Sequence, residues 1–310
     1  MIDHPARAVA ARFRRPVLLI VGCGDVGMRV LAQWRDALQA QRGWRVLALT
    51  SSPERMAVLR AAGAVPILGN LDEPASLRRL AGLADAVLHL APPPGTGAVD
   101  PRTAALIRAL RRSGRCKRWI YGSTSGVYGN CDGQRFDESR PVAPATDRAR
   151  RRVDAETQLR MFGAGEGRKV SLLRIPGIYA VDRVGGHPRD RVLRGAPVLH
   201  SQDDVYTNHI HADDLARACI AALHRGAPQR AYHVSDDSSQ KMGDHFDAVA
   251  DRYGLPRPPR ISRAESAVQL SPMQLSFMGE SRQLINQRMK RELRLSLRFP
   301  SVLTALLDEA

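Results

Sequence analysis

The chain has 310 residues, 44% of them hydrophobic, enough to bury a large core in one big domain or two modest ones. Its net charge is +16, but the basic residues are scattered without a nucleic-acid motif, so nucleic acid is not expected as a partner. No apolar run approaches the ~20 residues of a membrane span, and the cysteines lack C-x-x-C or metal spacing, which favours a cytoplasmic protein without disulfides; they are Cys23, Cys116, Cys131 and Cys219.

The first predicted element is a strand over residues 16–21 that runs into a G-x-G-x-x-G pattern of Gly22, Gly24 and Gly27. An amphipathic helix follows, and strand, tight turn and helix are the context in which this pattern binds a dinucleotide. Gly22 would let the chain turn, Gly24 would let backbone approach a pyrophosphate, and Gly27 would let the helix pack on the strand. The alternative is a glycine-rich structural turn.

The start of this helix is predicted to face the cofactor. The amides at Asp25 and Val26 would meet the phosphates at the positive end of the helix dipole. Arg14 and Arg15 before the strand, with Cys23 after it, resemble a lipoprotein signal. The apolar run is too short for the ~7–15 residues of a signal peptide's hydrophobic region, so we interpret it as the first strand.

A second strand is predicted over residues 44–50, and its end bears on the choice of cofactor. An acidic residue there would hold the ribose hydroxyls of NAD, but the chain has Thr50 and Ser51, with Arg55 one turn further on. Hydroxyls and a guanidinium in place of a carboxylate favour a 2′-phosphate, so NADP(H) is favoured over NAD(H). The alternative is that residues 51–55, which are predicted to open a helix, supply only a cap and a solvated arginine.

Three further strands are predicted over residues 64–68, 86–90 and 119–121. The alternation of short apolar runs with helical patterns predicts βαβ units, hence an α/β fold with a Rossmann-type, doubly wound parallel sheet. The loops that follow the third and fourth strands would cross the cofactor, and their expected contacts are Asn70, Leu71, Ala91 and Pro92.

Two groups of histidines have a structural and a functional interpretation. His89, on the fourth predicted strand, is interpreted as a packed core residue rather than a ligand. His209 and His211 share one face of a strand because side chains alternate along it, and Asp213 and Asp214 follow. We favour a strand that ends in a helix capped by an aspartate over a metal cluster, and no metal site is expected.

Four ordered motifs from the fifth predicted strand onward carry a family resemblance. They are residues 123–129 (Ser-Thr-Ser-Gly-Val-Tyr-Gly), 173–179 (Leu-Arg-Ile-Pro-Gly-Ile-Tyr), 208–216 (Asn-His-Ile-His-Ala-Asp-Asp-Leu-Ala) and 232–235 (Tyr-His-Val-Ser). With them the chain resembles the extended branch of the short-chain dehydrogenase/reductase superfamily, the nucleotide-sugar epimerases and dehydratases. The resemblance covers nearly the whole chain and implies that Pro176 lies at the nicotinamide end of the cofactor.

The catalytic centre departs from that family. The family carries Tyr-x-x-x-Lys, with a proline four residues before the tyrosine and a glutamate four residues after the lysine. Pro144 and Glu156 fit this frame, which places Arg148 at the tyrosine and Arg152 at the lysine. An arginine stays protonated and has no acceptor, so it can orient or neutralise an anion but cannot serve as the base.

The resemblance therefore implies an atypical member that keeps the cofactor apparatus and has lost the standard proton relay. Thr124 matches the family's hydroxyl position and Tyr128 is a second polar candidate, so the expected catalytic residues are Thr124, Tyr128, Arg148 and Arg152. The expected function is that of an NAD(P)-binding oxidoreductase or epimerase-like protein acting on an unidentified, anionic small molecule. The alternative is a non-catalytic NADP(H)-binding sensor or scaffold. The sequence leaves open whether the protein forms a homodimer.

Two domains are expected. Residues 14–176 with about 205–235 form the dinucleotide-binding domain, and about 177–204 with 236–310 form a small substrate lobe. In that lobe Arg282 and Lys290 either hold a substrate phosphate or lie on a solvated helix face.

Overall fold

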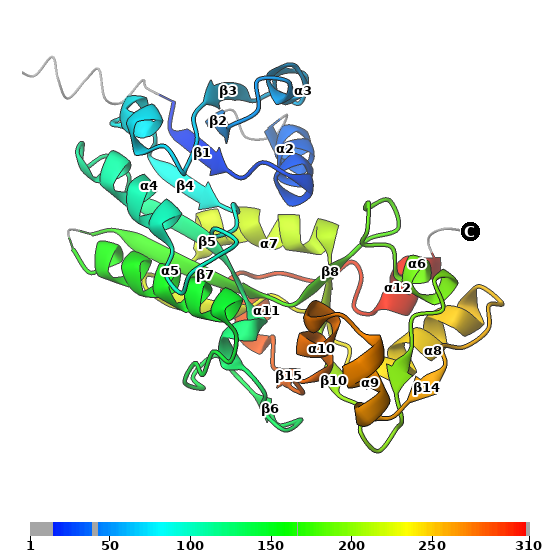
Figure 1. Ribbon diagram of the computed structural model, residues 1–310. Helices are drawn as coiled ribbons and strands as arrows, with labels where there is room; N and C mark the ends of the chain where they lie inside the picture. Colours follow the sequence, from blue (N-terminus) through cyan, green and yellow to red (C-terminus); the bar gives the residue numbers. More distant parts are fainter. Residues whose placement is uncertain (1–14, 39–42, 166, 308–310) are drawn as a thin grey trace, which may run out of the picture.

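The computed structural model describes residues 15–38, 43–165 and 167–307, and a sheet of seven parallel strands lies at its centre (Figure 1). Every neighbouring pair in this sheet is parallel. In spatial order the strands are β3 (Val65–Leu68), β2 (Arg45–Thr50), β1 (Val17–Val21), β4 (Ala86–His89), β5 (Arg118–Thr124), β7 (Lys169–Ile175) and β12 (Arg230–His233). The chain starts in the middle of the sheet and winds outward in both directions, which confirms the doubly wound α/β fold.

Helices cover both faces of the sheet because successive strand residues point to opposite sides. Leu18 and Ile20 of β1 pack on one face, and Val17 and Leu19 on the other. The first face is covered by α2 (Asp25–Leu38), α3 (Arg55–Ala61), α7 (Ala212–Arg225) and α11 (Gln287–Glu292). The second is covered by η1 (Pro74–Leu80), α4 (Pro101–Arg111) and α5 (Asp147–Gly163).

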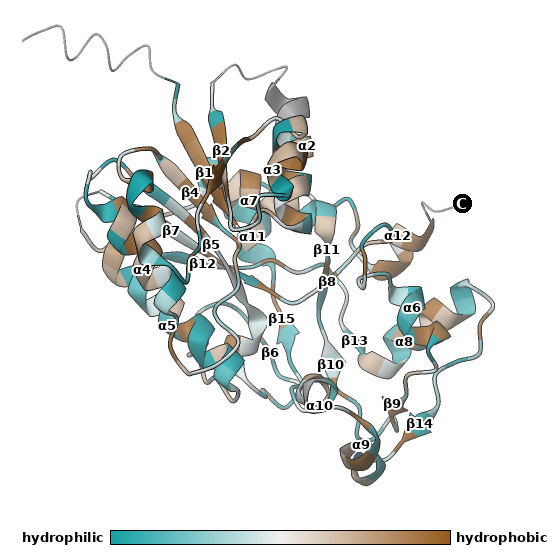
Figure 2. Cartoon of the chain, turned by 45° about the horizontal axis from the view of Figure 1, so that its top comes forward, coloured by the Kyte–Doolittle hydropathy of each residue, from teal (hydrophilic) through white to brown (hydrophobic). Residues whose placement is uncertain are grey.

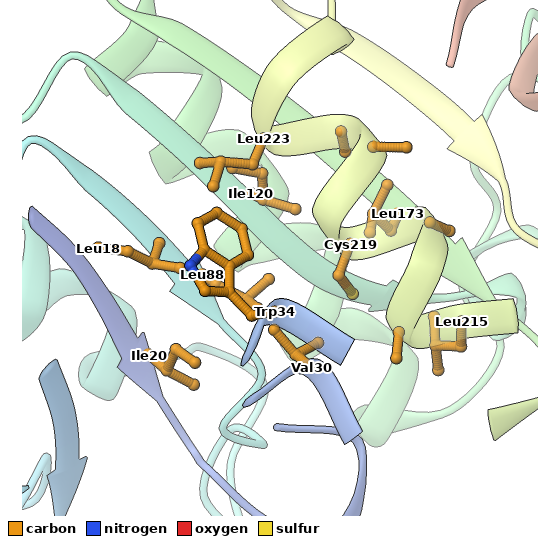
Figure 3. Packing of buried hydrophobic residues seen from close by; sticks show 14 of the residues in the cluster. Leu18, Ile20, Val30, Trp34, Leu88, Ile120, Leu173, Leu215, Cys219 and Leu223 are labelled. Atoms are coloured by element: carbon orange, nitrogen blue, oxygen red, sulfur yellow. The ribbon is translucent and has the colours of Figure 1, made fainter. Parts of the chain in front are cut away.

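The core on the first face is a continuous apolar layer. Figure 3 shows Val30 and Trp34 of α2 and Cys219 of α7 lying over the strand residues Leu88 and Ile120. Strands buried on both faces read as unbroken apolar runs, and β1 and β2 are accordingly brown along much of their length in Figure 2. His89 of β4 is 1% exposed and shares a hydrogen bond of 3.0 Å with Thr103, so the core interpretation of this histidine is confirmed.

The rest of the chain gathers beyond the carboxyl end of β7 (Figure 1). It has small hydrophobic clusters of its own. Its helices are α6 (Pro188–Leu193), α8 (Met242–Arg252), α9 (Arg263–Gln269), α10 (Pro272–Met278) and α12 (Val302–Leu307). Its short strands pair as β8 (Gly177–Tyr179) with β11 (His209–His211), β9 (Val198–Leu199) with β14 (Arg260–Ile261), and β10 (Tyr206–Thr207) with β13 (Gln240–Lys241).

One further strand pair and one short helix link this part to the sheet. β6 (Arg135–Phe136) pairs with β15 (Gln283–Leu284), and η2 (Ser125–Tyr128) follows β5 directly. The division into two domains stays a prediction, and its first residue, Arg14, lies outside the described residues. No helix within the described ranges is long and apolar enough to cross a membrane.

Two helix starts differ from the sequence prediction. α3 begins at Arg55, because the backbone carbonyl of Ser52 accepts from the Arg55 amide at 3.2 Å and holds the preceding residues in a turn. α7 is capped by a histidine rather than an aspartate: Nδ1 of His211 accepts from the Asp213 amide at 3.2 Å. The predicted aspartate cap was therefore wrong.

A buried ion pair fastens α5 to the sheet. The guanidinium of Arg174 on β7 donates to both carboxylate oxygens of Glu156 on α5, at 3.2 and 2.7 Å. Both side chains are only 4% exposed. The hydroxyl of Ser123 on β5 donates to the same carboxylate at 2.6 Å, so one acidic group joins a helix to two strands.

Replacing Glu156 by glutamine leaves the buried Arg174 without a counter-charge. Breaking such a pair from one side costs about 3–5 kcal/mol, so Glu156→Gln should lower the free energy of unfolding in urea by roughly that amount. The matched variant Glu54→Gln removes an exposed carboxylate and should change it by less than about 0.5 kcal/mol. Equal, small effects in both variants would show that the pair does not hold α5 in place.

Candidate cofactor cleft and active site

The glycine turn between β1 and α2 is shaped by close backbone packing. Gly22 has φ +81°, and a Cβ there would lie 2.3 Å from the backbone nitrogen of Ala91, so only glycine fits. A Cβ on Gly24 would meet no atom within 4 Å, which leaves open space above the turn. A Cβ on Gly27 would lie 3.0 Å from the sulfur of Cys23, so this glycine faces the turn rather than a cavity. The turn is therefore tightly packed at Gly22 and open at Gly24, which is the form that a pyrophosphate needs.

A cavity of about 550 Å³ lies beside this turn, at the carboxyl ends of the strands. Its size and position suit the adenosine half of a dinucleotide. The predicted cofactor residues that line it are Gly22, Gly24, Thr50, Ser51, Arg55, Asn70, Leu71, Ala91 and Pro92.

Two further charged residues, Asp72 in the loop after β3 and Arg102, line this cavity. Arg102 at the start of α4 donates to both oxygens of Asp72, at 2.7 and 2.6 Å. The same guanidinium donates to the backbone carbonyl of Pro92 at 3.1 Å. The ion pair thus ties the loops after β3 and β4 together across the cavity. The sequence analysis did not identify Arg102, because no local pattern links this arginine to Asp72, 30 residues earlier in the chain.

Arg55 brings a positive charge to the glycine turn. Its Nη2 donates to the carbonyl of Cys23 at 2.8 Å, while the hydroxyl of Thr50 accepts from the Ser52 amide at 3.2 Å. Arg55 therefore lies over the cofactor turn instead of extending into solvent. Burial raises the pKa of the Cys23 thiol to about 11, so this cysteine is a neutral packing residue.

A second cavity, of about 320 Å³, continues along the turn toward β5 and β7. Among the residues lining it are Asp25, Val26, Thr124, Arg152 and Pro176, all of them predicted site residues.

The carboxylate of Asp25 would repel a pyrophosphate, but two arginines neutralise it. Asp25 accepts from Nε of Arg29 at 3.2 Å and from Nε of Arg183 at 2.9 Å. Arg183 comes from the loop after β8 and lines the same cavity. It places a further cation beside the positive end of α2.

A third cavity, of about 620 Å³, opens from the second. Thr124, Arg152, Pro176, Ile178 and Arg183 line both, so the two spaces are continuous. It lies between the sheet's carboxyl end and the smaller part of the chain, where a substrate would meet the nicotinamide end of a cofactor.

One face of α5 supplies three guanidinium groups to this third cavity. Arg148, Arg151 and Arg152 stand at i, i+3 and i+4, a spacing that puts side chains on one side of a helix. No carboxylate of the described residues forms an ion pair with any of the three, whereas their neighbour Arg150 pairs with Asp147 at 2.6 Å. Arg151 is only 7% exposed and its Nε has no hydrogen-bond partner in the structure. The sequence analysis overlooked Arg151, although its helical spacing could have identified it.

The contacts of the other two arginines show how they are held. Nη1 of Arg152 donates to the carbonyl of Gly122 at 2.7 Å and to the hydroxyl of Tyr121 at 3.1 Å. Burial raises the pKa of that Tyr121 hydroxyl to about 12. The guanidinium of Arg148 lies 5.0 Å above the ring of Phe277 on α10, so helices from both parts of the chain meet there.

Tyr128 lies in the core, away from the cavities. It is 1% exposed, and its hydroxyl is bonded to Nε2 of His233 at 2.6 Å and to Nη1 of Arg174 at 2.6 Å. Burial raises its pKa to about 12. The structure therefore does not bring this tyrosine to Thr124, because η2 turns its side chain inward after β5.

The smaller part of the chain adds residues that the sequence analysis did not assign to the site. Arg191, His209 and Glu280 all line the third cavity. Burial, and then the neighbouring Arg194, lowers the pKa of Arg191. Burial lowers the pKa of His209 to about 4, so its imidazole is neutral at pH 7. None of these residues has a local sequence signal, because long-range packing brings them to the cavity.

The two basic residues proposed to hold a substrate phosphate are separated. Arg282 lines the third cavity. Lys290 lies in another cavity, with Asp237 and Arg294, and donates to the Asp237 carboxylate at 2.5 Å. Within the described residues, no group of three His, Cys, Asp or Glu side chains could hold a metal ion.

Comparison with known proteins identifies relatives of this architecture. The family model described as the NAD dependent epimerase/dehydratase family matches residues 19–235. A trifunctional UDP-glucose 4,6-dehydratase/UDP-4-keto-6-deoxy-D-glucose 3,5-epimerase/UDP-4-keto-L-rhamnose-reductase of Arabidopsis thaliana is 22% identical over 172 residues, covering 53% of this chain and 26% of that protein. The chain thus spans about a quarter of the length of the curated relatives it matches.

Solved structures resemble the chain over almost its whole length. A functionally unknown conserved protein from Silicibacter pomeroyi is 29% identical with a TM-score of 0.75, covering 94% of this chain and 96% of that one. MoeE5 in complex with UDP-glucuronic acid and NAD is 20% identical with a TM-score of 0.71, at coverages of 94% and 96%. At 20% identity the second likeness concerns the fold alone.

The glycine turn yields a prediction that separates binding from folding. A valine at Gly24 would project into open space where a pyrophosphate must lie, so Gly24→Val should fold normally and lose nucleotide binding in calorimetry. Gly22→Val should unfold, because its side chain would meet the backbone of Ala91. Gly43, outside these cavities, also has no atom of a described residue within 4 Å of its Cβ position, so Gly43→Val should keep both fold and binding. Unchanged nucleotide affinity in a folded Gly24→Val protein would refute the assignment.

Proposed function

The chain belongs to the NAD-dependent epimerase/dehydratase family and is an epimerase/dehydratase-like enzyme, and from this premise we propose that its substrate is an anionic small molecule. We further propose that NADP(H) is its preferred cofactor. The residues that would hold the dinucleotide are those of the glycine turn, Arg55 and the loops after β3 and β4. When bound, the nicotinamide supplies or accepts a hydride; the chain's own residues bind and orient the reactants.

The observation that carries the proposal is the charge of the third cavity. Its described lining includes six arginines and one carboxylate, Glu280. Two of the arginines have carboxylate partners, Arg183 with Asp25 and Arg282 with Glu280. The other four form no ion pair with a described carboxylate, although Arg151, Arg152 and Arg191 each donate to a backbone carbonyl. A charge-assisted pair between arginine and carboxylate or phosphate is among the stronger polar contacts in proteins. An uncharged substrate would leave these guanidinium groups without a counter-charge.

The positions of the arginines on α5 support an anionic group close to the reacting end of the substrate. Arg152 lines both the second and third cavities, and Thr124 does the same from β5. An anionic group held by Arg148, Arg151 and Arg152 would therefore lie close to the hydroxyl of Thr124. A nucleotide sugar that carries a carboxylate fits this charge pattern. UDP-glucuronic acid, which MoeE5 binds together with NAD, is the natural probe.

Arg55 should determine the cofactor preference. A contact between its guanidinium and a 2′-phosphate is worth roughly 1.5–3 kcal/mol, which is about tenfold to a hundredfold in affinity. NADPH should bind more tightly than NADH by that margin in calorimetry, and the margin should shrink in Arg55→Ala. Arg60→Ala, which removes an exposed arginine from the same helix, should preserve it. Equal affinities of the wild type for the two cofactors would contradict the preference for NADP(H).

Arg148 should act on substrate binding more than on chemistry. The wild type should bind UDP-glucuronic acid more tightly than UDP-glucose, and Arg148→Ala should remove roughly 1.5–3 kcal/mol of that binding with a smaller effect on the rate of a single turnover. Arg150→Ala, whose side chain points to Asp147 outside the cavity, is the matched control and should bind as the wild type does.

The opposite pattern would overturn this assignment. We expect no appreciable 4-keto chemistry on nucleotide sugars whose sugar is uncharged, because such a sugar offers no anion to the arginines on α5. Robust epimerase turnover by the wild type, lost in Arg148→Ala without a change in substrate affinity, would show that Arg148 takes part in the chemical step itself.

A further inference from the structure

The loss of the tyrosine leaves the site without the family's proton acceptor, and the structure holds a carboxylate close to the place where one is needed. We propose that Glu280 is the acid–base residue of this cavity. The inference rests on the proposed function, since it supplies the proton transfer that an oxidoreductase acting there requires.

Glu280 and Thr124 line the same cavity, and both have an oxygen near Gly126. If Gly126 carried a Cβ, that atom would lie 3.5 Å from Oγ1 of Thr124 and 4.0 Å from Oε2 of Glu280. The hydroxyl and the carboxylate therefore face the same small space above η2, and glycine at 126 keeps that space open. Thr124 accepts from the Gly126 amide at 3.2 Å, which leaves its own proton free to donate to a substrate oxygen.

Local structure holds the carboxylate at this point. Nη1 of Arg282 donates to Oε2 of Glu280 at 2.8 Å and to the carbonyl of Gly129 at 2.6 Å. The next residue, Ser281, is tied by its amide to Asn130 at 2.9 Å. The segment after α10 is thus fixed to the loop after η2, and the Glu280 side chain is only 13% exposed. A group held this way costs little reorganisation when it reacts.

Other candidate bases are less suited to the role. Tyr121 and Tyr128 are buried with pKa values raised to about 12, and Tyr128 does not line the cavity. Burial lowers the pKa of His209 to about 4, and its ring stacks on His245 with centroids 4.0 Å apart. Tyr206 is the remaining lining residue with an ionisable oxygen. The experiment below therefore distinguishes it from Glu280.

The proposed step is the oxidation of a secondary alcohol by NADP⁺. Thr124 donates a hydrogen bond to the substrate oxygen. The O–H proton passes to the Glu280 carboxylate as the substrate C–H bond breaks, the hydride leaves to the nicotinamide, and the carbon–oxygen double bond forms. Reduction runs in reverse, with protonated Glu280 giving the proton back. The arginines on α5 hold the substrate's anionic group, so acid–base chemistry and anion binding are divided between two sides of the cavity.

The test compares Glu280→Gln with the wild type, using UDP-glucuronic acid and NADP⁺ as probes. Calorimetry should find UDP-glucuronic acid bound at least as tightly by the variant, because the change removes a negative charge from a cationic cavity. The single-turnover rate of hydride transfer, followed by nicotinamide absorbance, should fall about 10²–10⁴-fold, the usual contribution of a positioned acid–base group. Asp244→Asn, which removes an exposed carboxylate from α8 in the same part of the chain, should leave both values unchanged.

The outcomes separate the inference from the proposed function. A wild type that binds NADPH but neither binds nor oxidises UDP-glucuronic acid would overturn the proposed function, and the inference with it. An active wild type whose rate is unchanged in Glu280→Gln would overturn the inference alone, as would a loss of rate in Tyr206→Phe but not in Glu280→Gln. Weaker binding of UDP-glucuronic acid by Glu280→Gln, with an unchanged rate once the ligand is bound, would also overturn it, because Glu280 would then only position the ligand.

Discussion

The ion pair between Glu156 and Arg174 is the interaction on which the site depends. It fixes α5 to β7, and through Ser123 it fixes the same helix to β5 just before Thr124. Arg174 also donates to Tyr128, so the end of η2 is held by the same buried group. A buried pair of this kind adds little net stability against an apolar replacement, but it is costly to break from one side. Its effect here is geometric: the helix that carries the cavity's arginines and the strand that carries its hydroxyl are held in one arrangement.

The two sides of the third cavity contribute opposite kinds of chemistry. The sheet side provides guanidinium groups from α5, which bind an anion but cannot accept a proton. The smaller part of the chain provides Glu280, held by Arg282 after α10. Under the proposed function, an arginine at the position of the family's tyrosine changes the role of the helix from proton transfer to charge recognition. In the proposed step the acceptor lies on the facing segment, whose carboxylate is the only one in the cavity's described lining.

Much of the fold and the cofactor cleft could be predicted because their signals are local. The apolar runs of β1 and β2 and the glycine turn are contiguous in sequence, and every predicted cofactor residue except Gly27 lines one of the three cavities. Whether they bind the dinucleotide stays a prediction. Tyr128 was misplaced because a motif does not say which way a short helix turns its side chains. Arg151 could have been predicted, because helical spacing puts it on the same side of the helix as Arg148 and Arg152. Glu280 reaches the cavity only through tertiary packing, which one sequence does not reveal.

We propose above all that the arginines of α5 bind the anionic group of the substrate beside Thr124. The most direct measurement is a crystal structure of the protein with UDP-glucuronic acid and NADP⁺. We expect the sugar carboxylate at about 2.7–2.9 Å from guanidinium nitrogens of Arg148, Arg151 or Arg152, with a sugar hydroxyl between Thr124 and Glu280. A sugar bound with its carboxylate in solvent, and with those three arginines making no contact to it, would contradict the account.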